Sequence, residues 1–128
     1  MTVLDYIEVR YSCGEKVEEM MNEITRSYLP MTETAFYILL TLQKVHYGYG
    51  IMQDVEKLTN GRIKLGAGTI YGSLSRMEKD QLIEVVGEEN RRKSYTATKL
   101  GRELLQQEIA RISELYHNAI QMEGNNNE

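Results

Sequence analysis

The stretch from Leu65 to Val86, LGAGTIYGSLSRMEKDQLIEVV, constrains the fold of this chain more than any other. Its spacing predicts a helix over Gly68 to Lys79. One apolar stripe is formed by Ile70, Leu74 and Met77, which recur at i, i+4 and i+7. At about 100° per residue, the opposite side carries small polar residues and one long cation. These residues are Thr69, Gly72, Ser75 and Arg76.

The residues that follow predict a β-hairpin with a basic turn. Leu82 to Val86 is a short β-branched run, and Arg91 to Thr98 predicts a second strand that starts with three cations. This order of elements is typical of the second half of a winged helix. A small polar helix face suits a DNA major groove, and a basic hairpin suits the neighbouring phosphates. The alternative is an ordinary helix with a solvated face, although that face lacks the usual Glu/Lys mixture.

Charge is distributed unevenly along the 128 residues, whose formal net charge is −4. Residues 1–60 and residues 103–128 each carry −4, whereas residues 61–102 hold nine basic and five acidic residues and carry +4. The positive block coincides with the predicted helix and hairpin, and local charge sets the field at a binding face. The excess is modest, which predicts weak non-specific binding to DNA.

The first half of the chain predicts three helices. Lys16 to Leu29 has an apolar stripe and ends at Pro30, because the residue before proline is disfavoured in a helix. Thr32 is a suitable N-cap for a helix from Glu33 to Val45. A third helix runs from Tyr49 to Thr59.

Three further expectations concern the end of the third helix, the segment that follows it, and a pair of methionines near the start of the chain. In the third helix Leu58 is expected to face inward, and Asn60-Gly61 is a plausible C-cap. The segment Arg62 to Leu65 is a candidate strand beside the hairpin. The pair Met20-Met21 leaves open whether the preceding residues belong to the native protein.

Thr98 is a suitable N-cap for a last helix that runs to Met122. Its apolar stripe is too long for a lone terminal tail, so it requires a partner helix from the N-terminal segment or from a second subunit. We favour a homodimer over packing within one subunit. The predicted dimerisation residues are Leu104, Leu105, Ile109, Ile112, Leu115 and Ala119.

The predicted fold is mainly α with a small β-hairpin wing, a winged helix-turn-helix followed by a long C-terminal helix. Residues 1–30 form an N-terminal extension with a helix, residues 31–98 the winged-helix domain, and residues 99–128 the dimerisation helix and a polar tail. Hydrophobic residues make up 41% of the chain, enough for a packed core. The single cysteine, Cys13, suits a reducing cytoplasm, and no apolar run is long enough to cross a bilayer.

The sequence does not predict an enzyme, a metal site or a cofactor. The two histidines, His46 and His117, are remote in sequence from Cys13. The segment Gly66 to Gly68 lacks the lysine that a phosphate-binding loop needs. The acidic residues lie on helix faces, where solvated surface is the default.

With these motifs placed, the sequence resembles the PadR family of bacterial winged-helix transcriptional regulators, in its short form with one C-terminal dimerisation helix. The resemblance covers roughly residues 31–122. It is carried by residues 47–51 (YGYGI), 68–74 (GTIYGSL), 82–83 (LI) and 92–101 (RKSYTATKLG). The family commonly has glycine where Gln81 stands, so the recognition helix is expected to end without a left-handed cap.

This resemblance implies a DNA-binding transcriptional regulator, a repressor that binds an inverted repeat as a homodimer. Half-sites are then roughly one helical turn, ~34 Å, apart. The expected contacts to double-stranded DNA are Thr69, Tyr71, Gly72, Ser73, Ser75 and Arg76 in the helix, with Arg91, Arg92 and Lys93 in the wing. The alternative is a winged-helix protein-interaction module with little DNA binding, which the overall negative charge favours slightly.

The resemblance also implies a small planar or amphipathic effector. If the N-terminal helix packs on the C-terminal helix, the residues available to line a cavity include methionines, which adapt to varied apolar ligands. These residues are Met20, Met21, Ile24, Tyr28, Ile112, Tyr116 and Ile120. The alternative, slightly favoured, is that these side chains interdigitate and leave no cavity.

Overall fold

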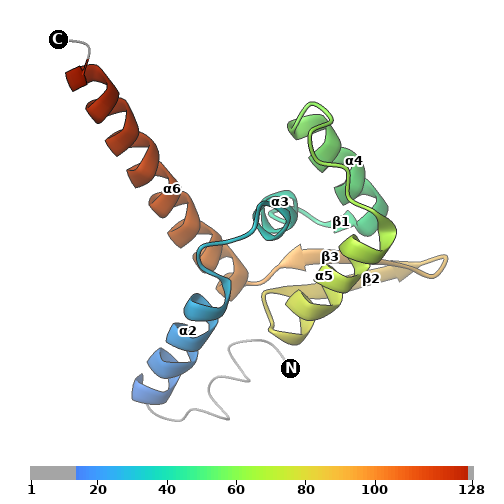
Figure 1. The fold of residues 1–128 in the computed structure, drawn as a ribbon. Coiled ribbons are helices and arrows are strands. Elements are labelled where there is room, and N and C mark those ends of the chain that lie inside the picture. Colours follow the sequence, from blue (N-terminus) through green and yellow to red (C-terminus); the bar gives the residue numbers. More distant parts are fainter. Residues whose placement is uncertain (1–13, 127–128) are drawn as a thin grey trace.

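The computed structural model describes residues 14–126, with side chains described for residues 18–125. Figure 1 shows helices and a small sheet gathered into one body, from which the last helix projects. The elements are α2 (Gly14–Tyr28), α3 (Glu33–Thr41), β1 (His46–Tyr47), α4 (Gly48–Leu58), α5 (Ala67–Lys79), β2 (Ile83–Glu89), β3 (Arg92–Ala97) and α6 (Lys99–Asn126). The predicted winged helix with a long C-terminal helix is confirmed. Within the described residues, none of the helices is long and apolar enough to cross a membrane.

The hydrophobic core lies between α3, α4, α5, the sheet and the first turns of α6. Helix α5 turns its predicted stripe of Ile70, Leu74 and Met77 into this core, where all three side chains are buried. Removing such side chains from water contributes about 1.5–3 kcal/mol each. The burial of this stripe leaves the small polar face of α5 outward.

Helix α3 begins where the sequence predicts and ends earlier. Thr32 is confirmed as the N-cap, because its hydroxyl accepts the backbone N–H of Ala35 at 3.1 Å. The helix stops at Thr41, so its predicted end at Val45 is wrong. The carbonyl of Leu42 accepts the backbone N–H of Ala97 at 2.8 Å, and this bond to β3 replaces the next turn of helix.

The sheet has three antiparallel strands in the order β1-β3-β2. One of its two edge strands is β1, in which His46 lies opposite Tyr95 and Tyr47 opposite Ser94. The expectation that residues 62–65 would supply this strand is wrong. The chain leaving α3 already occupies the edge of β3, and the N–H of Ile63 is bonded instead to the Thr59 hydroxyl at 3.0 Å.

Helix α4 ends in the predicted C-cap, but one of its leucines faces outward. Asn60 has φ 51° and Gly61 φ 79°, and the N–H of Gly61 reaches the carbonyl of Glu56 at 2.8 Å. This is the bonding pattern of a Schellman motif. Leu58 is 56% exposed, so its predicted inward position is wrong. Thr59 is buried in its place and donates its hydroxyl to the carbonyl of Val55.

Helix α5 ends in a left-handed cap despite having no glycine there. Gln81 has φ 63°, and the N–H of Leu82 bonds to the carbonyl of Met77 at 2.9 Å. The expectation that this helix would end without such a cap is wrong. The hydroxyl of Thr98 donates to the carbonyl of Gln81 at 2.7 Å, which helps to hold the glutamine in this conformation.

We expect Gln81→Gly to raise the free energy of unfolding by about 0.5–1 kcal/mol. A residue other than glycine loses about 1–2 kcal/mol of stability in the left-handed conformation, and glycine avoids this loss. Part of the gain is offset because glycine has more conformational freedom in the unfolded chain. Thermal unfolding measures the change. As a control, Lys79→Gly places glycine in the right-handed helix and should destabilise by about 1 kcal/mol. A destabilised Gln81→Gly protein would contradict the left-handed conformation.

Helix α6 is divided between the core and the surface. Its N-cap is confirmed, because the hydroxyl of Thr98 accepts the N–H of Gly101 at 3.1 Å. A Cβ at Gly101 would collide with the carbonyl oxygen of Leu82, so only glycine permits this close packing. Leu104 and Leu105 are buried in the core of their own chain, so they cannot form a surface for a second subunit and their assignment to dimerisation is wrong. From residue 109 onward the apolar side chains are exposed.

A buried carboxylate joins α6 to the segment that precedes α3. Glu108 is 1% exposed and accepts the backbone N–H of Met31 at 2.6 Å. Both Nε and Nη2 of Arg111 donate to the same carboxylate. Hydrogen bonding from Arg111 lowers the pKa of Glu108 from its ordinary value. This contact anchors the base of α6 on the winged-helix body.

We expect Glu108→Gln to lower the free energy of unfolding at neutral pH by about 1–3 kcal/mol, because it removes a charge-assisted bond. The folded-state pKa of Glu108 is depressed, so its contribution is present above the unfolded value of about 4.3 and is lost as pH falls through the folded value. The stability difference between the wild type and the variant should therefore begin to shrink as the pH falls below about 4.3, and disappear below the depressed folded-state value. Denaturant unfolding at several pH values measures this, and a constant difference down to pH 2.5 would contradict the role given to Glu108.

Candidate nucleic-acid interface

The exposed face of α5 carries the residues that the sequence selected for DNA contact. Thr69, Gly72, Ser75 and Arg76 are exposed, Ser73 is half-buried, and the ring of Tyr71 is 51% exposed. The helix begins at Ala67 after Gly66, which has extended backbone angles and no side chain to cap the first N–H groups. The first turn of α5 therefore offers backbone donors beside a face of small side chains.

The wing presents its three cations at the tip of the hairpin. Asn90 and Arg91 both have positive φ, 52° and 65°, which defines a two-residue type I′ turn. Arg91 therefore lies in the turn and not in the predicted strand. Arg92 and Lys93 begin β3, and all three cations are exposed. Their cross-strand neighbours are acidic, since Glu89 lies opposite Arg92 and Glu88 opposite Lys93.

A hollow of about 470 Å³ lies between the hairpin of β2 and β3, the wing, and helix α5. Its walls come from β1, α4, α5, the hairpin turn and β3, and they combine cations with tyrosine rings. The lining residues are Tyr47, Gly48, Tyr49, Tyr71, Arg91, Arg92, Lys93 and Tyr95. The structure thus brings the wing cations and Tyr71 into one basic, aromatic surface, which suits a phosphate backbone.

Sequence reasoning did not assign Tyr47, Gly48 and Tyr49 to this surface. The structure places them there because α4 begins at Gly48, directly beside the ring of Tyr71. A Cβ on Gly48 would lie 2.9 Å from Cε1 of Tyr71, so a larger residue would push the ring away. The signal in the sequence is the repeated Tyr-Gly pair at residues 47–50.

Tyr95 contributes the floor of the hollow and is 7% exposed. Burial raises the pKa of Tyr95, with Glu78 as a second cause, so its hydroxyl stays protonated to a higher pH than that of an exposed tyrosine. Tyr95 therefore belongs both to the core and to the lining of the hollow.

The C-terminal end of α5 is tied to α2. The Tyr28 hydroxyl donates to the Asp80 carboxylate at 2.5 Å, and the Arg76 guanidinium lies 4.9 Å from the centre of the Tyr28 ring. Arg76 also faces Ser27, with 3.4 Å between Nη2 and Oγ. Burial raises the pKa of Tyr28, with the Asp80 hydrogen bond as the second cause. Arg76, near the C-terminal end of α5, thus contacts Ser27 and Tyr28 of α2 in its own chain.

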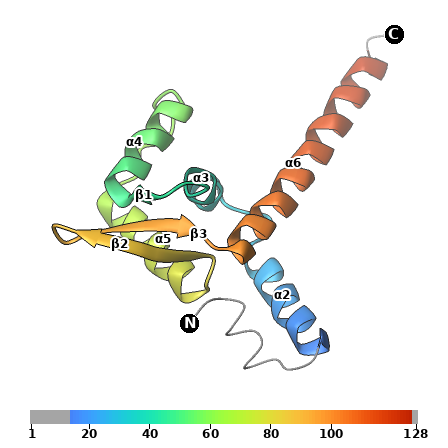
Figure 2. The same ribbon diagram turned by 180° about the vertical axis from the view of Figure 1, so that it is seen from behind.

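The residues proposed for an effector cavity are not brought together in one chain. Figure 2 shows the free end of α6 and the first turn of α2 at opposite ends of the molecule. Met21 and Ile24 pack on the core and Tyr28 is buried in it, whereas Tyr116 and Ile120 are exposed on the projecting half of α6. The expectation that α2 packs along α6 and encloses a cavity with Met20 is therefore wrong within one chain.

The fold and this surface define a winged helix-turn-helix DNA-binding protein. A protein-family model, described as the Transcriptional regulator PadR-like family, matches residues 38–107. The chain belongs to this family, whose members are transcriptional regulators, and is a DNA-binding transcription regulator.

Two uncharacterized proteins are similar to the chain in sequence, and a solved structure of a PadR-like transcription factor shares its fold. The chain is 30% identical over 98 residues to an uncharacterized protein X of Lysinibacillus sphaericus, covering 73% of this chain and 86% of that one. It is 39% identical over 70 residues, 52% of this chain, to an uncharacterized 37.1 kDa protein in a transposon of Streptomyces fradiae, of which it spans 20%. The X-ray structure of a PadR-like transcription factor from Bacteroides fragilis is 28% identical, with TM-score 0.59 over 70% of this chain and 89% of that chain.

Proposed function

We propose that the protein is a transcriptional repressor that binds an inverted-repeat operator as a homodimer. The observation that carries the proposal is the continuity of the small polar face of α5, the tyrosine-lined hollow and the cationic wing tip. The recognition helix would enter the major groove, with Thr69, Gly72, Ser73 and Ser75 near base edges. The wing cations and Tyr71 would contact the flanking backbone. A dimer bound across a promoter excludes polymerase without any further surface.

The projecting half of α6 supports the homodimer. Ile109, Ile112 and Leu115 are each more than one-third exposed, and Ala119 continues the same face. An exposed apolar stripe of this length on one helix is typical of a helix–helix interface. Pairing α6 with its copy would also set the two recognition helices at a fixed separation.

Selection of duplexes from a random library tests the proposal. We expect the wild type to enrich an inverted repeat whose half-site centres lie ~34 Å, one helical turn, apart. Gel shifts at several salt concentrations, with a scrambled duplex as the control, then measure specificity and the number of phosphate contacts. Equal affinity for selected and scrambled duplexes would contradict sequence-specific regulation.

A protein-interaction module remains the second candidate. It is favoured by the acidic residues Glu88 and Glu89, which lie opposite Lys93 and Arg92 and reduce the positive charge of the wing. That candidate predicts little binding to any duplex at physiological salt, so the same gel shifts separate the two functions.

We expect Arg76→Gln to leave the salt dependence of DNA binding unchanged, because its guanidinium is held against Tyr28 and Ser27. A direct phosphate contact would instead reduce the slope of log K against log salt by about 0.9. In a double-mutant cycle with Tyr28→Leu, the changes in the free energy of unfolding should deviate from additivity by about 0.5–1 kcal/mol. Arg92→Gln is the control. It should reduce the salt slope of DNA binding, and its effect on the free energy of unfolding should add to that of Tyr28→Leu.

A further inference from the structure

The joint between β1 and α4 contains a histidine–aspartate pair that reaches from the strand to the second turn of the helix. Strand β1 has only two residues, and the chain passes from it into α4 at Gly48 without a loop (Figure 1). His46 lies in β1 and Asp54 in α4, and 2.8 Å separates Nε2 of the histidine from Oδ2 of the aspartate. The pair therefore ties the strand to the helix that follows it.

Helix α4 begins without the side-chain cap that usually fixes the first turn of a helix. Its N-cap is Tyr47, whose side chain makes no capping hydrogen bond, whereas Ser, Thr, Asp or Asn would do so. The ring of His46 instead lies against the helix at Gly50, because a Cβ on that residue would collide with Cε1 of the ring. The histidine is therefore the side chain that braces the first turns of α4.

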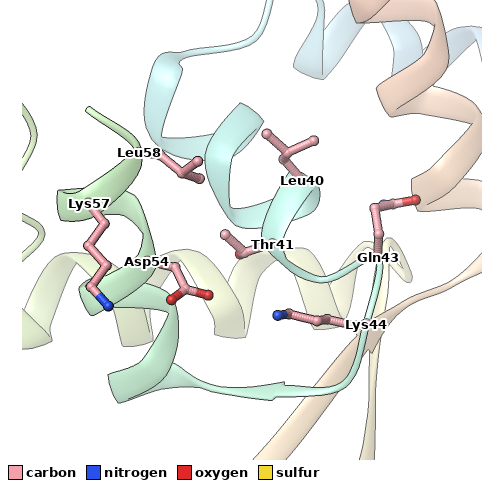
Figure 3. A pocket seen from close by; sticks show the side chains of 7 residues that line it. All are labelled: Leu40, Thr41, Gln43, Lys44, Asp54, Lys57 and Leu58. Atoms are coloured by element: carbon pink, nitrogen blue, oxygen red, sulfur yellow. The ribbon is translucent and has the colours of Figure 1, made fainter. Parts of the chain in front are cut away.

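Asp54 is held by this histidine and not by its lysine neighbours. Figure 3 shows the Asp54 carboxylate in a hollow between α3 and α4, with the ammonium groups of Lys44 and Lys57 on either side. Among the described residues, His46 is its one ion-pair partner within 4.0 Å. The bond to His46 is thus the contact that orients this carboxylate.

Two exposed tyrosines flank the joint that the pair braces. Tyr47 precedes Gly48 and Tyr49 follows it, and the two side chains are 42% and 60% exposed. Both line the hollow between the wing and α5, which we call the DNA-facing hollow, and Gly48 lies against the ring of Tyr71 there. A change in the angle between β1 and α4 would therefore move both hydroxyls relative to Tyr71 and the wing.

We propose that His46 and Asp54 are positioning residues for DNA binding. Their hydrogen bond holds the joint so that the hydroxyls of Tyr47 and Tyr49 reach the phosphate backbone beside the wing. Tyrosine hydroxyls are common donors to phosphate oxygens in protein–DNA interfaces. The proposal rests on DNA binding through this hollow, which is part of the proposed function.

Gel shifts with the selected duplex measure the effect on binding. We expect His46→Ala to raise Kd about tenfold, because one or two hydrogen bonds to phosphate are misplaced. The slope of log K against log salt should stay as in the wild type, because a tyrosine neutralises no phosphate charge. His46→Gln keeps a side-chain N–H that can reach Asp54, so it should recover most of the lost affinity.

Asp54→Ala separates positioning from charge. Removing a carboxylate makes the protein less negative, which by itself favours binding to DNA. The positioning role predicts the opposite, a weakening similar to that of His46→Ala, with no further loss when the two changes are combined. The matched control is Glu56→Ala, which removes an exposed carboxylate from the same helix and should bind the duplex at least as tightly as the wild type.

Tyr47→Phe combined with Tyr49→Phe tests the same step without touching the pair. This variant should lose as much affinity as His46→Ala, and adding His46→Ala to it should cause no further loss, because the histidine acts through these tyrosines. Thermal unfolding of every variant shows that the protein is folded at the temperature of the gel shifts.

Gly50→Ala tests the geometry of the joint through stability. Alanine normally stabilises a helix relative to glycine, but here its Cβ would displace the His46 ring. The change should therefore lower Tm in the wild type and raise it in the His46→Ala background.

Three results would overturn the proposal. They are wild-type affinity in the Tyr47→Phe/Tyr49→Phe protein, tighter binding by Asp54→Ala, and a further loss of affinity when His46→Ala is added to the tyrosine variant. A wild type that binds selected and scrambled duplexes equally would instead contradict the proposed function. That failure is seen in the wild-type gel shifts before any variant is compared.

Discussion

Ile112→Asp combined with Leu115→Asp should convert the protein into a folded monomer and reduce operator binding to the non-specific level. Both side chains are exposed in the single chain and lie on the projecting half of α6, so the winged-helix core does not depend on them. In a dimer seam the same positions would bury unpaired carboxylates, which costs several kcal/mol. A monomer can occupy only one of the two half-sites. Sedimentation equilibrium and gel shift with the selected duplex measure the two effects.

The matched control places the same two charges on the other side of α6. His117→Asp and Gln121→Asp lie roughly opposite the apolar stripe at about 100° per residue, and both positions are exposed. This variant should remain dimeric and bind the operator as the wild type does. A wild type that sediments as a monomer would rule out the paired-site operator, and a dimeric Ile112→Asp/Leu115→Asp protein would place the interface elsewhere on the chain.

Replacing Arg91, Arg92 and Lys93 with alanine should weaken binding to every duplex by roughly 100-fold near 0.15 M salt. Each phosphate that the wing no longer neutralises lowers the slope of log K against log salt by about 0.9, and this effect is the same for all sequences. Alanine at residue 91 has the same Cβ as arginine, so the turn at φ 65° is not made easier or harder by the change. Gel shifts from 0.05 to 0.3 M salt measure both the affinity and the slope.

The control for the wing removes two exposed cations from the start of α6, Lys99→Ala and Arg102→Ala, neither of which lines the DNA-facing hollow. We expect its salt slope to equal that of the wild type. A wing variant with an unchanged slope would show that the wing does not touch the backbone. In that case the acidic residues of the wing, Glu88 and Glu89, would be the ones that contact a partner, as the protein-interaction alternative requires.

Local chemistry explains why much of the fold was predictable. The stripe of Ile70, Leu74 and Met77 has the period of a helix, and both Thr32 and Thr98 accept an N–H three residues later as N-caps do. These signals depend on residues within one or two turns of each other. They determined where α3, α5 and α6 begin, which face of α5 is buried, and the hairpin that follows it.

The early end of α3 was decided by a residue far along the chain. The carbonyl of Leu42 bonds to Ala97, and the next residues form a strand against Tyr95. Nothing within residues 33–45 indicates that partner, so the apolar pattern overestimated the helix. The left-handed Gln81 was missed for the same kind of reason, since its carbonyl accepts the hydroxyl of Thr98.

The sequence by itself determined that the helices form, the N-caps at Thr32 and Thr98, the C-cap at Asn60 and Gly61, the hairpin and the positive block that the hairpin carries. These features depend on periodicity, capping chemistry and local charge. Tertiary structure alone decided which tyrosines join the DNA-facing hollow, that Arg76 is held by Tyr28, and that Leu104 and Leu105 are buried while Ile112 and Leu115 are not. A periodic stripe shows that one side of a helix is apolar. Which part of that stripe is covered depends on where the rest of the chain packs, and that is a property of the folded body.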